Sequence, residues 1–246
     1  MKKIVSFCFL LLLLISPITY GQAIDYEVNG ETYEGYYLAG PAKAPLVLLI
    51  HDWDGLTDYE ITRSTMLNKL GYSVFAADLF GKGVRPTEVK DKRQHTGELY
   101  KDRDKMRALM TGALTTAKQQ GANVDNAVAM GYCFGGAAIL ELARAGTALK
   151  GFASFHGGLG TPEGQDYSKV SAPIMIFHGT ADTAITMTDF ATLAEELEQA
   201  GVKHEMISYG GAPHSFTHFG SERYRKDADE QSWARFLAFM KKVLGQ

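Results

Sequence analysis

The chain has 246 residues, of which 46% are hydrophobic, with 25 lysines and arginines against 28 aspartates and glutamates. A chain of this length can bury one sizeable core, so we expect an ordinary soluble globular protein of one or two domains. The mildly acidic balance, with no basic block and no heptad pattern, argues against a nucleic-acid-binding protein and against a coiled coil.

The N-terminal residues have the pattern of an export signal. Two lysines precede an apolar run at residues 4–15, and small residues follow at 21–23, where cleavage is expected. The run is shorter than the roughly 20 residues of a membrane-spanning helix, although an uncleaved anchor stays open. We therefore predict a signal peptide over 1–23, a single domain over 24–246, a periplasmic or secreted location, and no stable membrane association after cleavage.

Removal of this segment affects the cysteines. Cys8 would be lost and Cys133 would remain as the only thiol, so no internal disulfide could form. A lone cysteine in an oxidising compartment needs another reason to be present. A thiol redox role is disfavoured because no resolving cysteine would remain.

The first half of the mature chain alternates strand and helix patterns. Asn29-Gly30 predicts a hairpin between strands at 24–28 and 33–38. The apolar run at 46–50 is typical of a buried parallel strand. Next come a helix from the capping box Thr57-x-x-Glu60 to about Leu70, a strand at 72–77 and a long segment of helical character at 88–120.

A Gly-x-Cys-x-Gly turn follows the apolar run 127–130 and precedes the helix-forming run 137–143. This strand–turn–helix order is that of a nucleophile elbow, with Cys133 in the place that serine usually takes. The glycines permit a strained turn, and the helix N-terminus favours a thiolate and a nearby oxyanion. The plainer interpretation is a small buried cysteine in a glycine-rich turn.

The second half continues the alternation. Strands are predicted at 151–155, 173–177 and 205–209, with a helix ended by Gly201 and a C-terminal helix. The pattern predicts an α/β fold with a mostly parallel, doubly wound sheet and helices on both faces. Ligands bind such sheets at the carboxyl ends of the strands.

A thiol nucleophile needs a base and an acid that orients the base. Asp182 follows the strand predicted at 173–177, and His214 follows the strand at 205–209, so the order is nucleophile, acid, base. His218 is the rival base. Asp182 could instead cap the next helix, although Asp189 would serve equally well.

Two backbone N–H groups are expected to form an oxyanion hole, those of Phe134 and Trp53. Histidines at predicted strand ends, 51, 156 and 178, could suggest a metal site beside Cys133. No two of them share a close ligand spacing, so no metal is expected.

Taken together, these residues resemble the dienelactone hydrolase family of α/β hydrolases over nearly the whole mature chain. The motifs that carry the resemblance are those at 51–56, 78–81, 131–136, 155–158, 178–182 and 213–216. The resemblance implies the α/β-hydrolase fold, a Cys133–His214–Asp182 triad, hydrolysis of esters or lactones through a thioester, and no cofactor. It also implies that Asp52, where the family usually has glutamate, holds the resting thiol neutral and turned away.

The resemblance further implies two arginines that clamp a substrate carboxylate. At the matching places this chain offers Lys82 and Arg85 in one loop and His218 in another. Lysine and histidine lack the bidentate fork of arginine, so dienelactone itself is not expected as the natural substrate. We expect an exported cysteine-dependent hydrolase of small carboxylic esters or lactones. The alternative is a non-catalytic small-molecule-binding protein with the same fold.

Overall fold

The computed structural model describes residues 21–245, and the elements below belong to that range. The strands are β1 (Gln22–Val28), β2 (Glu31–Leu38), β3 (Pro45–Ile50), β4 (Ser73–Ala77), β5 (Asn123–Tyr132), β6 (Gly151–Phe155), β7 (Ile174–Gly179) and β8 (His204–Tyr209). The helices are α1 (Asp58–Asn68), α2 (Val89–Lys101), α3 (Arg103–Gln119), α4 (Phe134–Arg144), α5 (Met187–Gln199) and α6 (Lys226–Leu244).

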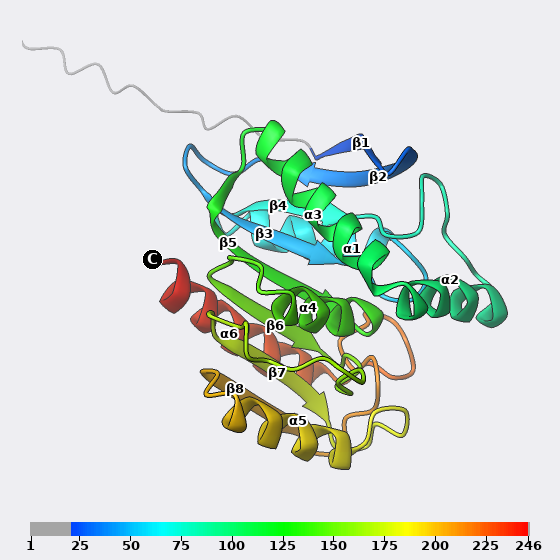
Figure 1. Ribbon diagram of the computed structural model, residues 1–246, viewed down its shortest axis with the longest axis vertical. Helices are drawn as coiled ribbons and strands as arrows, with labels where there is room; N and C mark the ends of the chain where they lie inside the picture. Colours follow the sequence, from blue (N-terminus) through cyan, green and yellow to red (C-terminus); the bar gives the residue numbers. More distant parts are fainter. Residues whose placement is uncertain (1–20, 246) are drawn as a thin grey trace, which may run out of the picture.

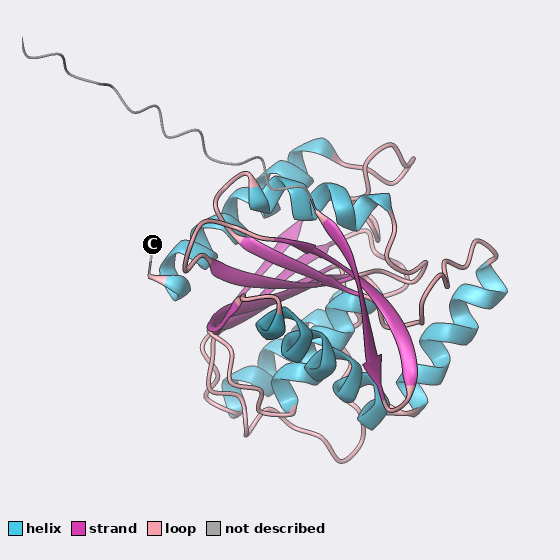
Figure 2. Cartoon of the chain, turned by 90° about the horizontal axis from the view of Figure 1, so that it is seen from above, coloured by secondary structure: helices cyan, strands magenta, loops and turns pink. Residues whose placement is uncertain are grey.

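Within residues 21–245 the strands form one eight-stranded sheet in the order β1-β2-β4-β3-β5-β6-β7-β8. The β1–β2 and β2–β4 pairs are antiparallel and all other pairs are parallel. Helices cover both faces of the sheet (Figures 1 and 2). The predicted fold class is therefore confirmed.

The N-terminal hairpin turns at Asn29 and Gly30, both with positive φ (52° and 80°), as a two-residue turn of this kind requires. Strand β1 begins two residues inside the range predicted as signal peptide, because Gln22 and Ala23 already pair with β2. Gly21 precedes the strand, and residues 1–20 of that predicted segment lie outside the described residues. In the described part of the chain, no helix is long and apolar enough to span a bilayer.

The segment predicted as helical at 88–120 consists of two helices. Asp102 leaves the helical conformation, with φ −111° and ψ 81°, and its side chain accepts the amide of Lys105 at 2.9 Å. It thereby caps α3 while α2 ends. After the break, α2 lies beyond the carboxyl ends of the parallel strands (Figure 1).

The turn between β5 and α4 is packed too closely for any side chain at its glycines. A Cβ on Gly131 would lie 2.3 Å from the backbone of Gly135, and one on Gly135 would lie 2.3 Å from the carbonyl oxygen of Ile50. Between the two glycines, Cys133 has φ 50° and ψ −113°. Such strain costs of order 1–3 kcal/mol and persists because the surrounding structure over-determines it.

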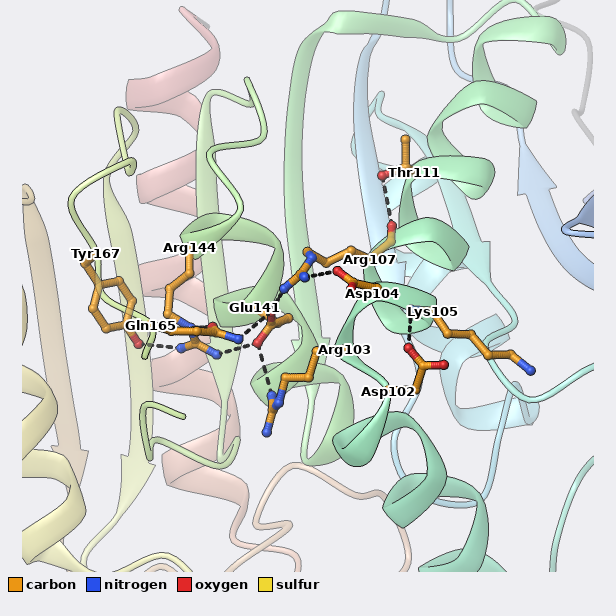
Figure 3. A network of polar contacts seen from close by, with 10 residues as sticks. All are labelled: Asp102, Arg103, Asp104, Lys105, Arg107, Thr111, Glu141, Arg144, Gln165 and Tyr167. Atoms are coloured by element: carbon orange, nitrogen blue, oxygen red, sulfur yellow. Dashed lines mark hydrogen bonds and ion pairs between the residues drawn. The ribbon is translucent and has the colours of Figure 1, made fainter. Parts of the chain in front are cut away.

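A buried ionic network holds α4 in place behind this turn. The fully buried carboxylate of Glu141 accepts hydrogen bonds from Arg103 (3.1 Å) and Arg107 on α3, from Arg144 one turn along α4 (3.0 Å), and from Gln165 (3.0 Å). Figure 3 shows these side chains converging on Glu141. Because the carboxylate is paired on all sides, its burial is compensated and α4 is tied to α3.

The crowding at the turn can be tested with alanine. We expect Gly135→Ala to lower the free energy of unfolding by about 1–3 kcal/mol or more, since its Cβ would meet rigid backbone. Gly97→Ala, in α2 where a Cβ would meet nothing within 4 Å, is the matched control. It should raise stability by roughly 0.5–1 kcal/mol. Urea denaturation measures both, and equal stabilities of the two variants would contradict this account of the turn.

Candidate active site

Three loops at the carboxyl ends of parallel strands bring a thiol, an imidazole and a carboxylate into one line. Cys133 follows β5, Asp182 follows β7 and His214 follows β8. The Cys133 sulfur lies 3.1 Å from Nε2 of His214, and Nδ1 of the same ring lies 2.7 Å from Oδ2 of Asp182. The structure therefore brings together the three residues predicted as nucleophile, base and acid.

Hydrogen bonds fix the state of the Asp182 carboxylate. Its Oδ1 accepts the amides of Ala184 and Ile185, each at 2.9 Å. Burial raises its pKa, but the bonds from His214 and from these amides outweigh burial and hold the pKa below its usual range. An ionised carboxylate only accepts, so Nδ1 of His214 carries a proton and Nε2 can act as a base. Helix α5 is capped separately, by Thr186 and Asp189.

The surroundings of the sulfur favour the neutral thiol. Burial, followed by the nearby carboxyl group of Asp52, raises the pKa of Cys133 well above that of a free cysteine. The Phe134 amide at the start of α4 acts in the opposite direction, because it donates toward the sulfur. With the base beside it, the thiol is placed to lose its proton to His214 during reaction.

Two main-chain N–H groups are free to bind an oxyanion beside the sulfur. Within residues 21–245, the amide of Trp53 has no hydrogen-bond acceptor, and the only acceptor near that of Phe134 is the Cys133 sulfur. Both residues line the same pocket as Cys133. These are the two amides for which the sequence predicted an oxyanion hole.

The Asp52 carboxyl is directed to its own loop. Its Oδ1 accepts the amide of Asp54 at 3.0 Å, and in the described part of the chain it makes no hydrogen bond to Cys133. Burial raises the pKa of Asp52 well above its usual range, and Asp54 takes the ionised role beside Lys92, 3.4 Å away. The prediction that Asp52 holds the thiol turned away is therefore wrong: Asp52 bonds within its own loop, and the sulfur faces His214.

A pocket of about 370 Å³ opens over the sulfur, a size suited to a small molecule. Its lining includes Trp53, Arg93, Thr96, Tyr100, Cys133, Phe134, Gly158, Ala184, Ile185, His214, Ser215 and Arg223. Aromatic rings form much of the wall, and two arginines stand at the exposed rim. The pocket therefore combines an apolar interior with local positive charge.

The residues predicted to bind the substrate lie elsewhere. Lys82 pairs with Asp25 on the β1–β2 hairpin. The Arg85 guanidinium is held by the carbonyl oxygens of Leu56 and Val84. These two and His218, whose ring stacks on Tyr59 with 4.7 Å between centroids, are absent from the pocket lining.

The sequence interpretation missed the two arginines at the rim. Arg93, Thr96 and Tyr100 recur at positions i, i+3 and i+7 of α2, so they share one helix face, a signal that was available. What that face would contact depended on the break at Asp102. Arg223 lies in the loop before α6, where no sequence pattern marks it.

The predicted strand-end histidines have separate roles. Nε2 of His51 accepts the amide of Leu79 at 3.0 Å and Nδ1 donates to the Asp52 carbonyl oxygen at 2.6 Å, whereas His178 stacks on Phe190. Among residues 21–245, no group of three or more histidine, cysteine or acidic side chains is arranged to hold a metal ion.

Known proteins are similar to this chain over most of its length. The model of the dienelactone hydrolase family matches residues 35–244. A protein of Escherichia coli named "Putative carboxymethylenebutenolidase" is 24% identical over 82% of this chain and 78% of its own length. The solved structure "m3DLH" is 28% identical, with a TM-score of 0.86 over 92% of this chain and 99% of its own. A dienelactone hydrolase-like promiscuous phosphotriesterase from metagenomic libraries is 26% identical, with a TM-score of 0.83 over 92% and 98%.

The neutral resting thiol has a measurable consequence. Because the raised pKa leaves Cys133 protonated at neutral pH, iodoacetamide should alkylate the native protein more slowly than it alkylates free cysteine, whose pKa is about 8.5. The rate should continue to rise with pH above that value. Mass spectrometry of the labelled peptide measures it, with the urea-unfolded protein as control. Faster labelling of the native protein than of the unfolded chain at pH 7 would contradict the assignment.

Proposed function

Because the chain belongs to the dienelactone hydrolase family, we propose that it hydrolyses small carboxylic esters or lactones with Cys133 as the nucleophile. The observation that carries the proposal is the continuous hydrogen-bonded line from the Cys133 sulfur through His214 to Asp182, at 3.1 and 2.7 Å, on the floor of a small-molecule pocket. A nucleophile, its base and the group that orients the base are the minimum set for covalent acyl transfer.

Acylation begins when the substrate carbonyl meets the sulfur. The thiol proton moves to Nε2 of His214 as the C–S bond forms, and the imidazolium is stabilised by the ionised Asp182. The carbonyl oxygen becomes an oxyanion that accepts from the amides of Trp53 and Phe134. When the tetrahedral intermediate collapses, the C–O bond breaks and His214 returns the proton to the leaving alkoxide, which leaves a thioester on Cys133.

Deacylation repeats these steps with water. Nε2 of His214 removes a proton from a water molecule that attacks the thioester carbonyl, and the same two amides stabilise the second oxyanion. The C–S bond then breaks, the proton passes to the sulfur, and the acid leaves. The reaction needs no group beyond these side chains and amides.

A non-catalytic binding protein is the second candidate, and it accounts for less of the geometry. A binding pocket does not need its cysteine at φ 50°, nor a base aligned on its sulfur. Such strain is typical of functional sites, where a reacting group must be held in one direction.

The pocket also indicates a class of substrate. Arg93 and Arg223 stand at its rim, while Trp53, Tyr100 and Phe134 line its wall. Arginine binds carboxylates through charge-assisted hydrogen bonds. We therefore favour a substrate that carries a free carboxylate and a hydrophobic portion in addition to the ester or lactone bond that is cleaved.

Export is part of the proposal and rests on residues 1–23 alone. The charged start, the apolar run and the small residues after it are those of a signal peptide. The reaction would then take place in the periplasm or outside the cell.

The nucleophile can be tested directly. We expect Cys133→Ala to reduce turnover of p-nitrophenyl acetate by at least about 10³-fold, and Asp182→Asn to reduce it through loss of the correct His214 tautomer. Stopped by acid during turnover, the wild-type protein should carry one acetyl group on Cys133, seen by mass spectrometry. Turnover by Cys133→Ala equal to the wild type would sink the proposal, because hydrolysis would then not depend on the thiol.

The preference for an anionic substrate can be tested by charge removal at the rim. Arg93→Gln and Arg223→Gln should each raise KM for a carboxylate-bearing ester by roughly 10-fold, consistent with loss of about 1.5 kcal/mol of charge-assisted bonding. KM for p-nitrophenyl acetate, which is neutral, should change little. Lys82→Gln is the matched control and should alter neither value, since Lys82 pairs with Asp25. An effect of Lys82→Gln with none from the arginines would restore the sequence-based assignment.

A further inference from the structure

His156 is a buried histidine beside the nucleophile that the reaction described above does not use. It follows β6, whose last residue, Phe155, pairs with Tyr132 at the end of β5, so His156 stands opposite Cys133. Its side chain is almost completely buried, and its φ is 41°, in the left-handed region that few residues other than glycine adopt. A strained residue next to a strained nucleophile indicates that the position of this ring matters.

Each nitrogen of the ring takes part in one hydrogen bond: Nδ1 accepts, and Nε2 donates. The Cys133 amide donates to the Phe155 carbonyl oxygen at 3.0 Å and to Nδ1 of His156 at 3.2 Å. Because an amide can only donate, Nδ1 must hold a lone pair, and the neutral ring carries its proton on Nε2. That nitrogen lies 2.8 Å from Oγ1 of Thr217 and donates to it. Burial lowers the pKa of His156 well below its ordinary value, which keeps the ring neutral.

Thr217 belongs to the loop that carries the base. It lies three residues after His214, and its hydroxyl bonds to that of Tyr59 at 2.7 Å. Its carbonyl oxygen accepts from Arg63 at 2.8 Å, and Arg63 is paired with Asp229 of α6. The base-bearing loop is thus anchored from α1 and α6 at this residue.

We propose that His156 is a positioning residue for the hydrolysis: by joining the amide of Cys133 to the hydroxyl of Thr217, it sets the distance between the sulfur and the imidazole of His214. The inference rests on the proposed function. The His156 ring also packs against the His214 ring in a T-shaped arrangement, with 5.4 Å between centroids and 65° between the planes, so it contacts the base directly. A displacement of about 1 Å at a reacting group can cost of order 10²-fold in rate.

The first test removes the hydroxyl that ends this connection. Thr217→Val keeps the shape of the side chain, and we expect it to lower kcat for p-nitrophenyl acetate by about 10- to 100-fold with KM unchanged. Thr217→Ser keeps the hydroxyl and should restore kcat to within a few-fold of the wild type. Ser64→Ala, which removes another buried hydroxyl of α1, is the matched control and should keep full activity.

A double-mutant cycle separates positioning from a general loss of stability. His156→Phe retains the ring and its packing but neither hydrogen bond, and should lower kcat to a similar extent. If the two residues act as one connection, His156→Phe with Thr217→Val will be no slower than the slower single variant. Multiplied losses, or a folded Thr217→Val variant with full kcat, would overturn the inference while leaving the proposed hydrolysis intact. Hydrolysis that does not depend on Cys133 would overturn the proposed function, and this inference with it.

A measurement independent of activity covers the case in which the variants do not fold. Nitrogen-15 NMR of the wild-type protein should show His156 as the neutral Nε2–H tautomer, with its proton in a hydrogen bond. A ring protonated on Nδ1 would overturn the inference, because the Cys133 amide would then face a donor.

Discussion

The backbone of Cys133 is held at positive φ because glycines on either side let a strand, a helix start and two loops approach it at distances that no side chain permits. Gly131 packs on Gly135, and Gly135 packs on the carbonyl oxygen of Ile50. A Cβ added to Gly136 would lie 2.8 Å from the Cα atom of Gly157. The same contacts bring the loops after β3 and β6 against the start of α4. The positions of the Trp53 and Phe134 amides and of His156 therefore all depend on this close approach. The ionic network around Glu141 holds α4 in its place against the sheet.

The site keeps its charges separated until substrate is bound. Burial disfavours a thiolate, so the resting Cys133–His214 pair is neutral, while Asp182 stays ionised because amides and His214 solvate it in place of water. In the reaction that we propose, negative charge develops on the oxyanion, which accepts hydrogen bonds from the free amides of Trp53 and Phe134. These preorganised N–H dipoles stabilise the transition state more than the bound substrate, and an interaction of that kind raises the rate.

Sequence patterns were informative where local rules decide the structure. The alternation of strands and helices along the chain, the capping box at Thr57 and the succession of Cys133, Asp182 and His214 follow from periodicity, turn chemistry and the layout of parallel sheets. The substrate side of the site did not follow, because it depends on contacts between distant segments. Lys82 is drawn to Asp25, 57 residues away, and its amide bonds to the carbonyl oxygen of Thr32. Such pairings leave no periodic trace, and neither does the break at Asp102 that turns one face of α2 toward the pocket.

The protonated thiol also bears on where such an enzyme can work. Thiolates oxidise far more readily than thiols, and a chain exported as we propose would expose a lone cysteine to an oxidising compartment with no partner thiol. A thiol whose pKa is raised by burial is protected there, but it is also a poor nucleophile unless a base lies within hydrogen-bond reach at the moment of attack. The 3.1 Å contact with His214 meets that need. The placement of the imidazole therefore has to be more exact than in an enzyme that keeps a resting thiolate, because the proton must leave as the C–S bond forms. We infer that this requirement is the reason why His156 is held in a strained conformation between the nucleophile and the base. His156 is buried and does not line the pocket, so it acts on the positions of these groups and not on the substrate.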